Sequence, residues 1–210
     1  ILAEKPLCQT LQEYESLTAL AGQSGVPIHI DFARQALDFY QLIHDKTKDA
    51  TSKSLYAHFP GGMVCIGIHM LALATWLLDA KTFKIIRSGC GKVHEAKRSG
   101  FFDLSGHITL VINDTMLVHL VATEKEEIFS VGITTEGSAF TVFEFAQKML
   151  RADAAKNITL HDIAIPLTSR LTGTLVMDFE RNGKFTLLPD ITQSYLAHKI
   201  LFEYLKTHNL

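Results

Sequence analysis

Two residues of this sequence, Lys5 and His69, have side chains that can exchange protons with a bound substrate. Lys5 lies in Glu4-Lys5-Pro6, directly after a short apolar run that is predicted to be a strand. Ligands of parallel α/β sheets bind at the carboxyl ends of the strands. We therefore expect Glu4 and Lys5 to point into a crevice; the alternative is a surface ion pair at a strand end.

His69 follows two glycines, Gly61 and Gly62, and lies one turn after Cys65 on a predicted helix that is otherwise apolar. The glycines would let the backbone come close to a ligand. A histidine in such a place can act as a general base, because its ordinary pKa is close to neutral. The alternative is a histidine that is hydrogen-bonded within the core.

Arg34 is a third candidate for the same crevice. It lies in Asp31-Phe32-Ala33-Arg34, just after the next predicted strand. The same sheet geometry places it near Lys5. The alternative is a solvated side chain at the start of a helix.

The elements that must position these residues begin as strand, helix and strand. Residues 1–3 and 26–30 are the strands, and Thr10 and Glu13 form a capping box that opens the helix between them. Two strands joined by a helix make a parallel crossover, as at the end of a doubly wound sheet. The predicted elements that follow are helix, strand and helix, over residues 33–46, 54–59 and 63–78.

The middle of the chain changes to strand-like runs rich in β-branched and aromatic residues. These runs cover residues 83–88, 107–112, 116–122, 128–133 and 139–143. Short turns between consecutive strands require antiparallel pairing. Two helices close the chain, one from Pro166 to Asn182-Gly183 and one capped by Asp190. The predicted fold class is α/β (α+β): the end of a Rossmann-type parallel unit, then an open, mainly antiparallel sheet with helices packed on one face.

The composition narrows the classes of partner. The 210 residues are 47% hydrophobic and 20% charged, which favours a packed core over disorder. A net charge of -2 and an isoelectric point near 6.6 argue against nucleic acid and anionic membranes as partners. The apolar stretch 59–78 is interrupted by glycines, so we expect a core helix and no membrane span. Three cysteines without disulfide spacing and no apolar leader favour a cytoplasmic protein.

Together the three patterns resemble the Gfo/Idh/MocA family of nicotinamide-dependent sugar and cyclitol dehydrogenases. The matching residues are Glu4-Lys5-Pro6-Leu7, Phe32, Arg34, Gly61, Gly62, Gly67, His69 and Trp76-Leu77-Leu78. Weaker similarity continues through the turn Thr135-Glu136-Gly137-Ser138 and through Arg181-Asn182-Gly183.

The resemblance implies two domains. Residues 1–31 would be the terminal strand–helix–strand of a dinucleotide-binding (Rossmann) domain, and residues 32–210 a C-terminal domain for substrate binding and oligomerisation. NAD or NADP would be the cofactor, bound mainly by a domain ahead of residue 1, with Glu4, Lys5 and Pro6 on the nicotinamide side.

The resemblance also implies roles for single residues. Lys5 and His69 would be catalytic, Arg34 and Cys65 would contact a small-molecule substrate, and no metal would take part. Hydride would pass between the nicotinamide and a sugar- or cyclitol-like hydroxyl or carbonyl carbon. His69 would exchange the hydroxyl proton, and the Lys5 ammonium would lower the pKa of the alcohol. Lys5, His69 and Arg34 should then converge, with the functional groups of Lys5 and His69 roughly 4–8 Å apart.

Departures from the family pattern keep other functions open. No G-x-G-x-x-G occurs in the sequence, so we expect the chain by itself to bind a dinucleotide poorly. Cys65 replaces the family's aspartate and Ala33 its asparagine. One alternative is an imine reductase of the thiazolinyl imine reductase type, and another is a non-catalytic sensor or structural protein that kept the fold.

Two further expectations concern metals and partners. Cys65 and His69 repeat the spacing of Cys90 and His94, and each pair would share a helical face if both segments were helical, which leaves a tetrahedral zinc site as an alternative. The exposed face of the predicted sheet should be apolar enough to pair with a second subunit, which makes a homo-oligomer the expected assembly.

Overall fold

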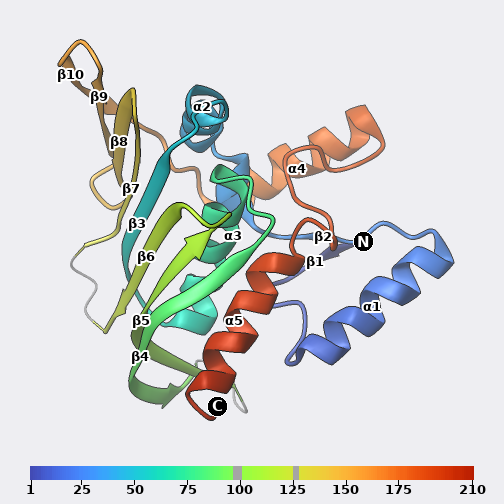
Figure 1. The fold of residues 1–210 in the computed structure, drawn as a ribbon. Coiled ribbons are helices and arrows are strands. Elements are labelled where there is room, and N and C mark those ends of the chain that lie inside the picture. Colours follow the sequence, from blue (N-terminus) through green and yellow to red (C-terminus); the bar gives the residue numbers. More distant parts are fainter. Residues whose placement is uncertain (97–100, 125–127) are drawn as a thin grey trace.

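An open eight-stranded sheet forms the centre of the protein, as the computed structural model shows for residues 1–96, 101–124 and 128–210 (Figure 1). Its strands are β3 (Lys53–Pro60), β4 (Phe83–Glu95), β5 (Phe102–Ile112), β6 (Met116–Thr123), β7 (Ser130–Thr135), β8 (Ser138–Phe143), β9 (Lys148–Asp153) and β10 (Ile158–Asp162). Their order in space is β10-β9-β8-β7-β3-β6-β5-β4. In the described residues β3 and β6 pair in parallel, and the other neighbours pair antiparallel.

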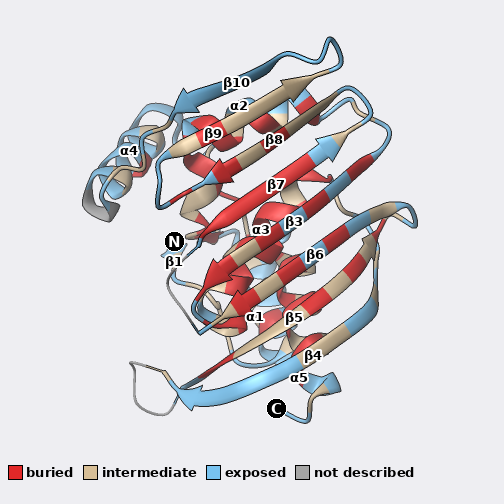
Figure 2. Ribbon diagram, turned by 90° about the vertical axis from the view of Figure 1, so that its left-hand side faces the viewer, coloured by how far each residue is buried: buried red, intermediate tan, exposed pale blue. Residues whose placement is uncertain are grey.

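The two faces of the sheet differ because side chains alternate along each strand. In β3, Leu55, Ala57 and Phe59 are buried, whereas Ser54 and Tyr56 are exposed. Figure 2 looks onto the open face, where exposed and buried residues alternate, with helices behind the sheet.

The helices lie on the other side of the sheet. They are α1 (Leu11–Ser24), the 3-10 turn η1 (Ala33–Ala36), α2 (Asp38–Thr47), the π turn η2 (Met63–Gly67), α3 (Ile68–Leu77), α4 (Thr168–Asn182) and α5 (Tyr195–Thr207). Helix α3 is apolar on nearly all sides because it lies between the sheet and α5, and its residues belong to the main core. The predicted fold class, with helices on one face of an open sheet, is confirmed.

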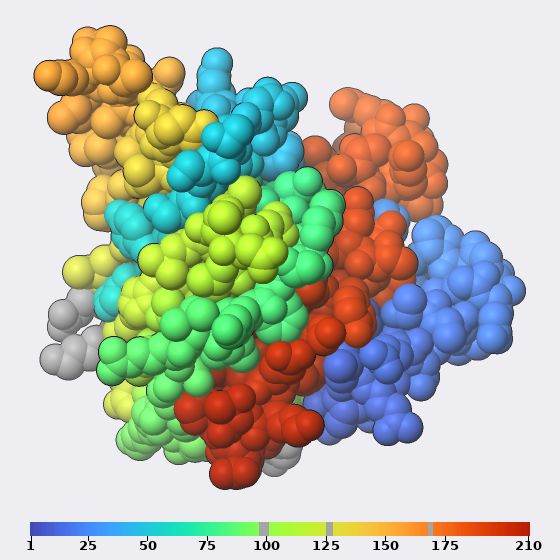
Figure 3. Space-filling view, viewed as in Figure 1, coloured from blue at the N-terminus to red at the C-terminus, as the bar shows by residue number. Residues whose placement is uncertain are grey.

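The N-terminal strands are short and form their own parallel pair. β1 (Leu2–Ala3) pairs with β2 (His29–Ile30), and α1 joins them. Thr10 and Glu13 make the predicted capping box of α1. The segment before α5 lies along β2, where the Ile30 amide donates to the Pro189 carbonyl at 3.0 Å. In Figure 3 the N-terminal part, in blue, therefore lies beside the C-terminal part, in red.

Several elements differ from the sequence-based prediction. The helix expected over 33–46 is broken at Leu37, whose extended backbone separates η1 from α2. The strand expected over 83–88 continues to Glu95, because β5 pairs with it along its whole length apart from two irregularities. Pro166 is not the first residue of α4, which begins at Thr168. Strands β9 and β10 were not predicted.

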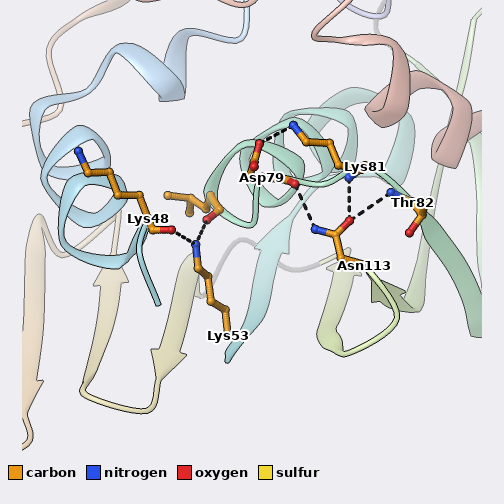
Figure 4. Close-up of polar contacts among 7 residues, drawn as sticks. Lys48, Lys53, Asp79, Lys81, Thr82 and Asn113 are labelled. Atoms are coloured by element: carbon orange, nitrogen blue, oxygen red, sulfur yellow. Dashed lines mark hydrogen bonds and ion pairs between the residues drawn. The ribbon is translucent and has the colours of Figure 1, made fainter. Parts of the chain in front are cut away.

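The carboxyl end of α3 is fixed by polar contacts that hold it against the sheet (Figure 4). The buried Lys53 donates to the carbonyls of Lys48 and Leu77, at 3.1 and 3.4 Å, where α2 and α3 end. A cation is favourable at that end of a helix dipole. Asn113, in the β5–β6 turn, accepts from the Lys81 amide at 2.8 Å and donates to the Asp79 carbonyl. The helix that bears His69 is therefore held firmly at its far end.

In the described part of the chain we find no helix with both the length and the apolar character that crossing a membrane requires.

Candidate active site

The carboxyl ends of β1 and β2 bring three charged residues together, Glu4, Lys5 and Asp31. The Asp31 amide donates to the Ala3 carbonyl at 2.9 Å, which places the two strand ends side by side. Burial raises the pKa of Asp31, the charge of Glu4 raises it further, and the charge of Lys5 opposes both. The Asp31 Oδ1 atom is buried without a hydrogen-bond partner among the described residues.

Lys5 reaches from the strand end to the first turn of the helix that bears His69. Its peptide bond to Pro6 is cis. The Lys5 ammonium donates to the carbonyl of Cys65 and lies 3.9 Å from the Cys65 sulfur. Cys65 itself is exposed. Residues 60 positions apart are thus joined at one place.

His69 lies near Lys5 and Arg34, and its imidazole is uncharged. Burial lowers its pKa well below 6.5, and the positive charges of Arg34 and Lys5 lower it further. Its Nδ1 atom is buried without a hydrogen-bond partner among the described residues, and its ring and that of Phe32 meet in a T-shaped arrangement with ring centres 5.7 Å apart. His69 therefore differs at Nδ1 from a hydrogen-bonded core histidine. The 4–8 Å separation from Lys5 stays a prediction.

Arg34 is held by an internal ion pair. Its Nε and one terminal nitrogen donate to the two carboxylate oxygens of Glu144, both at 2.9 Å. Tyr40 donates to the same carboxylate at 2.9 Å, and the guanidinium lies 4.7 Å from the centre of the Phe129 ring. Burial opposes the charged form of Arg34, but Glu144 outweighs it and raises the pKa of the guanidinium. The structure thus gives Arg34 a structural partner, and its contact with substrate stays a prediction.

His198 ties the Lys5 loop to the C-terminal helix, a role that the sequence analysis did not find. The Leu7 amide donates to its Nε2 at 3.2 Å, so Nδ1 carries the proton and donates to the Ser194 carbonyl at 3.0 Å. The ring packs on Tyr14 with centres 4.5 Å apart. Burial lowers the pKa of His198 to about 4.

The low pKa of His198 predicts acid-dependent stability. The unfolded chain binds the proton below about pH 6.5, but the folded chain does so only near pH 4. The free energy of unfolding should therefore fall by up to ~3 kcal/mol as the pH drops through this window. Urea unfolding at pH 7 and pH 5 measures the loss, which should be smaller in His198→Gln. The exposed His94→Gln is the control; equal losses in wild type and His198→Gln would contradict the prediction.

Asp31, Glu144 and His198 were not among the predicted site residues. Asp31 lay within the pattern Asp31-Phe32-Ala33-Arg34, but no local pattern marks Glu144 and His198, because each has its partner far away in the sequence. The separation is 110 residues between Arg34 and Glu144 and 191 residues between Leu7 and His198.

Cys90 and His94 do not share a helical face, because both lie in strand β4. Among the described residues no group of three or more histidine, cysteine or acidic side chains could hold a metal ion.

Comparison with known proteins gives structural matches only. No family sequence model matches the chain, and no curated relative matches it either. A dehydrogenase (MviM) from Clostridium difficile has a TM-score of 0.68 at 15% identity, over 98% of this chain and 70% of that one. An oxidoreductase domain protein from Kribbella flavida has a TM-score of 0.74 at 14% identity, over 100% and 73% of the two chains.

A third structure has a stated substrate. UDP-N-acetylglucosamine 3-dehydrogenase GnnA from Acidithiobacillus ferrooxidans has a TM-score of 0.73 at 11% identity, over 97% of this chain and 68% of that one. The chain thus has the fold of the larger part of these enzymes. The resemblance to Gfo/Idh/MocA-type oxidoreductases, from the end of the Rossmann domain onward, is confirmed at the level of fold.

Proposed function

We propose that the chain is the substrate-binding and catalytic part of an NAD(P)-dependent oxidoreductase that acts on a hydroxyl or carbonyl carbon of a small sugar- or cyclitol-like molecule. The observation that supports this most is the meeting of Lys5 with the turn that leads to His69. A neutral base can take the hydroxyl proton of an alcohol and a cation can stabilise the negative charge on its oxygen, which are the roles that a protein has in nicotinamide-dependent oxidation.

The site suits a nicotinamide cofactor beside a small substrate. Asp31 Oδ1 and His69 Nδ1 are buried atoms without partners in the described residues, so a ligand can supply the hydrogen bonds. NAD(P), when bound, supplies the acceptor or donor of the hydride. Its binding loop is not in these 210 residues, which contain no G-x-G-x-x-G.

The proton can be followed through residues of this chain. The Lys5 ammonium donates a hydrogen bond to the substrate oxygen and stabilises negative charge on it. His69, which is neutral, takes the proton of the substrate hydroxyl. At the same time the carbon that bears this hydroxyl loses a hydride, which carries away the electron pair of the C–H bond. In the direction of reduction, protonated His69 returns that proton to the oxygen.

Reduction of a ring C=N bond is the second candidate. Some hydrogen-bonding groups of the site already bind other residues of the chain: Arg34 binds Glu144, and Lys5 binds the Cys65 carbonyl. A sugar needs several free hydrogen-bonding groups, whereas a cyclic imine needs fewer. This observation is the support for the thiazolinyl imine reductase type as the alternative to the proposed sugar- or cyclitol-like substrate.

The test uses a polypeptide that carries a dinucleotide-binding domain ahead of residue 1. NADH and NADPH turnover should be measured with sugars, cyclitols and cyclic imines, and we expect turnover with one of these classes. The 210-residue chain alone should show no binding of either dinucleotide at micromolar concentration by calorimetry. Ligand binding without hydride transfer would favour the non-catalytic sensor and overturn the enzyme proposal.

We also propose that the open face of the sheet pairs two copies of the chain. Tyr56 and Leu117 lie on this face at 42% and 48% exposure, on the neighbouring strands β3 and β6. The ring of Tyr56 lies against Gly132, where a side chain would collide with it. Exposed apolar side chains on a sheet face favour association.

Light scattering should therefore give the mass of a dimer at micromolar concentration. The variant Tyr56→Glu/Leu117→Glu should be a monomer, because each interface would bury unpaired charge. Leu20→Glu, on the exposed side of α1, is the matched control and should remain a dimer. A monomeric wild-type protein would overturn this proposal.

A further inference from the structure

The carboxylate of Asp103 lies against the π turn η2, which carries Cys65 and leads into helix α3 with His69. Asp103 belongs to β5 and is 5% exposed. Its Oδ1 atom accepts from the amides of Val64 at 2.9 Å, Cys65 at 3.4 Å and Leu104 at 2.9 Å. Among the described residues, Asp103 takes part in no ion pair. Backbone amides are thus its principal partners.

The position of this carboxylate is that of a helix cap supplied by another element. The first amides of a helix have no partners within the helix and need an acceptor. Gly62 is the residue before the first turn and has no side chain that could cap it. Asp103 supplies the acceptor from the sheet, where the helix dipole also favours a negative charge.

Gly62 is a glycine because Asp103 takes the space of a side chain. A Cβ atom at position 62 would lie 1.8 Å from Asp103 Oδ1. The backbone angles of Gly62, φ -100° and ψ 168°, are open to any residue, so space is the constraint. The group that comes close to the Gly62 backbone is therefore this carboxylate, where the sequence suggested a ligand.

The same peptide that Asp103 holds also holds Lys5. The Cys65 amide donates to Asp103, and the Cys65 carbonyl accepts from the Lys5 ammonium. We propose that Asp103 is a positioning residue for Lys5, acting through the Cys65 peptide; its importance for turnover rests on the proposed function. Loss of the carboxylate would free the turn and leave Lys5 without a fixed acceptor.

The first test needs no enzymatic activity and uses the 210-residue chain. In Asp103→Ala the amides of Val64 and Cys65 should exchange hydrogen much faster than in wild type. Acetylation of Lys5 by an N-hydroxysuccinimide ester, followed by mass spectrometry, should also be faster, while acetylation of Lys81 should not change. Should this variant fail to fold, Asp103→Asn decides: its neutral acceptor gives weaker bonds, so both rates should lie above those of wild type.

The second test measures turnover in the polypeptide with its dinucleotide-binding domain. Asp103→Ala should lower kcat by about 10- to 100-fold, as expected for losing a charged hydrogen bond, and Asp103→Asn should restore most of it. The double variant Lys5→Ala/Asp103→Ala should have a kcat no lower than that of Lys5→Ala, because both substitutions remove the same function, that of Lys5. Val142→Ala, a buried change in β8, controls for lost stability and should leave kcat unchanged.

The two proposals fail in different ways. A wild-type protein without turnover would overturn the proposed function, and the exchange and labelling rates would still decide the role of Asp103. The positioning role would be overturned by unchanged hydrogen exchange at Val64 and Cys65 or by unchanged labelling of Lys5. It would also be overturned if the fold-losses of kcat in Lys5→Ala and Asp103→Ala multiplied in the double variant.

Discussion

Replacing His69 by alanine should lower kcat by about 10²–10⁴ in a polypeptide that carries the dinucleotide-binding domain, the usual range for removing a general base. The imidazole is uncharged because burial and the charges of Arg34 and Lys5 lower its pKa well below 6.5. It is therefore ready to take a proton at neutral pH. We expect KM to change much less than kcat, because the loss concerns proton transfer.

The direction of the pKa shift adds a pH dependence. A general base works only when unprotonated, and a lowered pKa keeps His69 unprotonated well below pH 6.5. In a plot of kcat against pH, the fall of kcat on the acid side should therefore occur below the pH range in which an ordinary histidine titrates. This fall should be absent from His69→Ala. His119, on the open face of the sheet, also has a pKa lowered by burial and is a matched control.

Two results would contradict this role for His69. One is a His69→Ala variant within a few fold of wild type. The other is an equal loss of kcat in His119→Ala, which would point to a general effect of removing a histidine.

The position of Lys5 at the carboxyl end of a strand could be predicted from the sequence by way of topology, whereas only the family resemblance implied that Lys5 meets the helix of His69. A capping box, a helix and two short apolar runs indicate a parallel pair, and the residue after its first strand must lie at the carboxyl end. What periodicity could not supply was the facing element. That Lys5 reaches the turn at Cys65 follows from packing between segments 60 residues apart.

The parts of the sheet that escaped prediction have physical reasons. Strand β10 is exposed along its whole length, so it lacks the alternation that marks a half-buried strand. β3 lies between β6 and β7, which are consecutive in the chain but do not pair. The rule that short turns join antiparallel neighbours fails there, because an earlier strand occupies the place between them.

The buried acids were out of reach for a different reason. Glu144 and Asp103 are single charged residues in or beside strand-like runs, where a charge usually faces water. Their burial depends on partners far away in the sequence: Arg34 and Tyr40 for Glu144, and the amides of the helix turn for Asp103.

Replacing Glu144 by alanine should lower the free energy of unfolding by about 3–5 kcal/mol, because it leaves the Arg34 guanidinium buried without its anion. The side chains of Arg34 and Glu144 are only 18% and 6% exposed, so water cannot take the place of the carboxylate. Tyr40 loses its acceptor at the same time. For a chain of this length the melting temperature should fall by about 10 °C.

An exposed ion pair of the same chain provides the control. Lys148 and Asp162 join β9 and β10 at 42% and 85% exposure, and Asp162→Ala should cost less than about 1 kcal/mol. Arg34→Met/Glu144→Leu should recover most of the stability that Glu144→Ala loses, since it removes the stranded charge as well as its partner. Urea unfolding of the three variants tests this. Equal losses in Glu144→Ala and Asp162→Ala would mean that water reaches Arg34, and the guanidinium would then be free to serve the substrate.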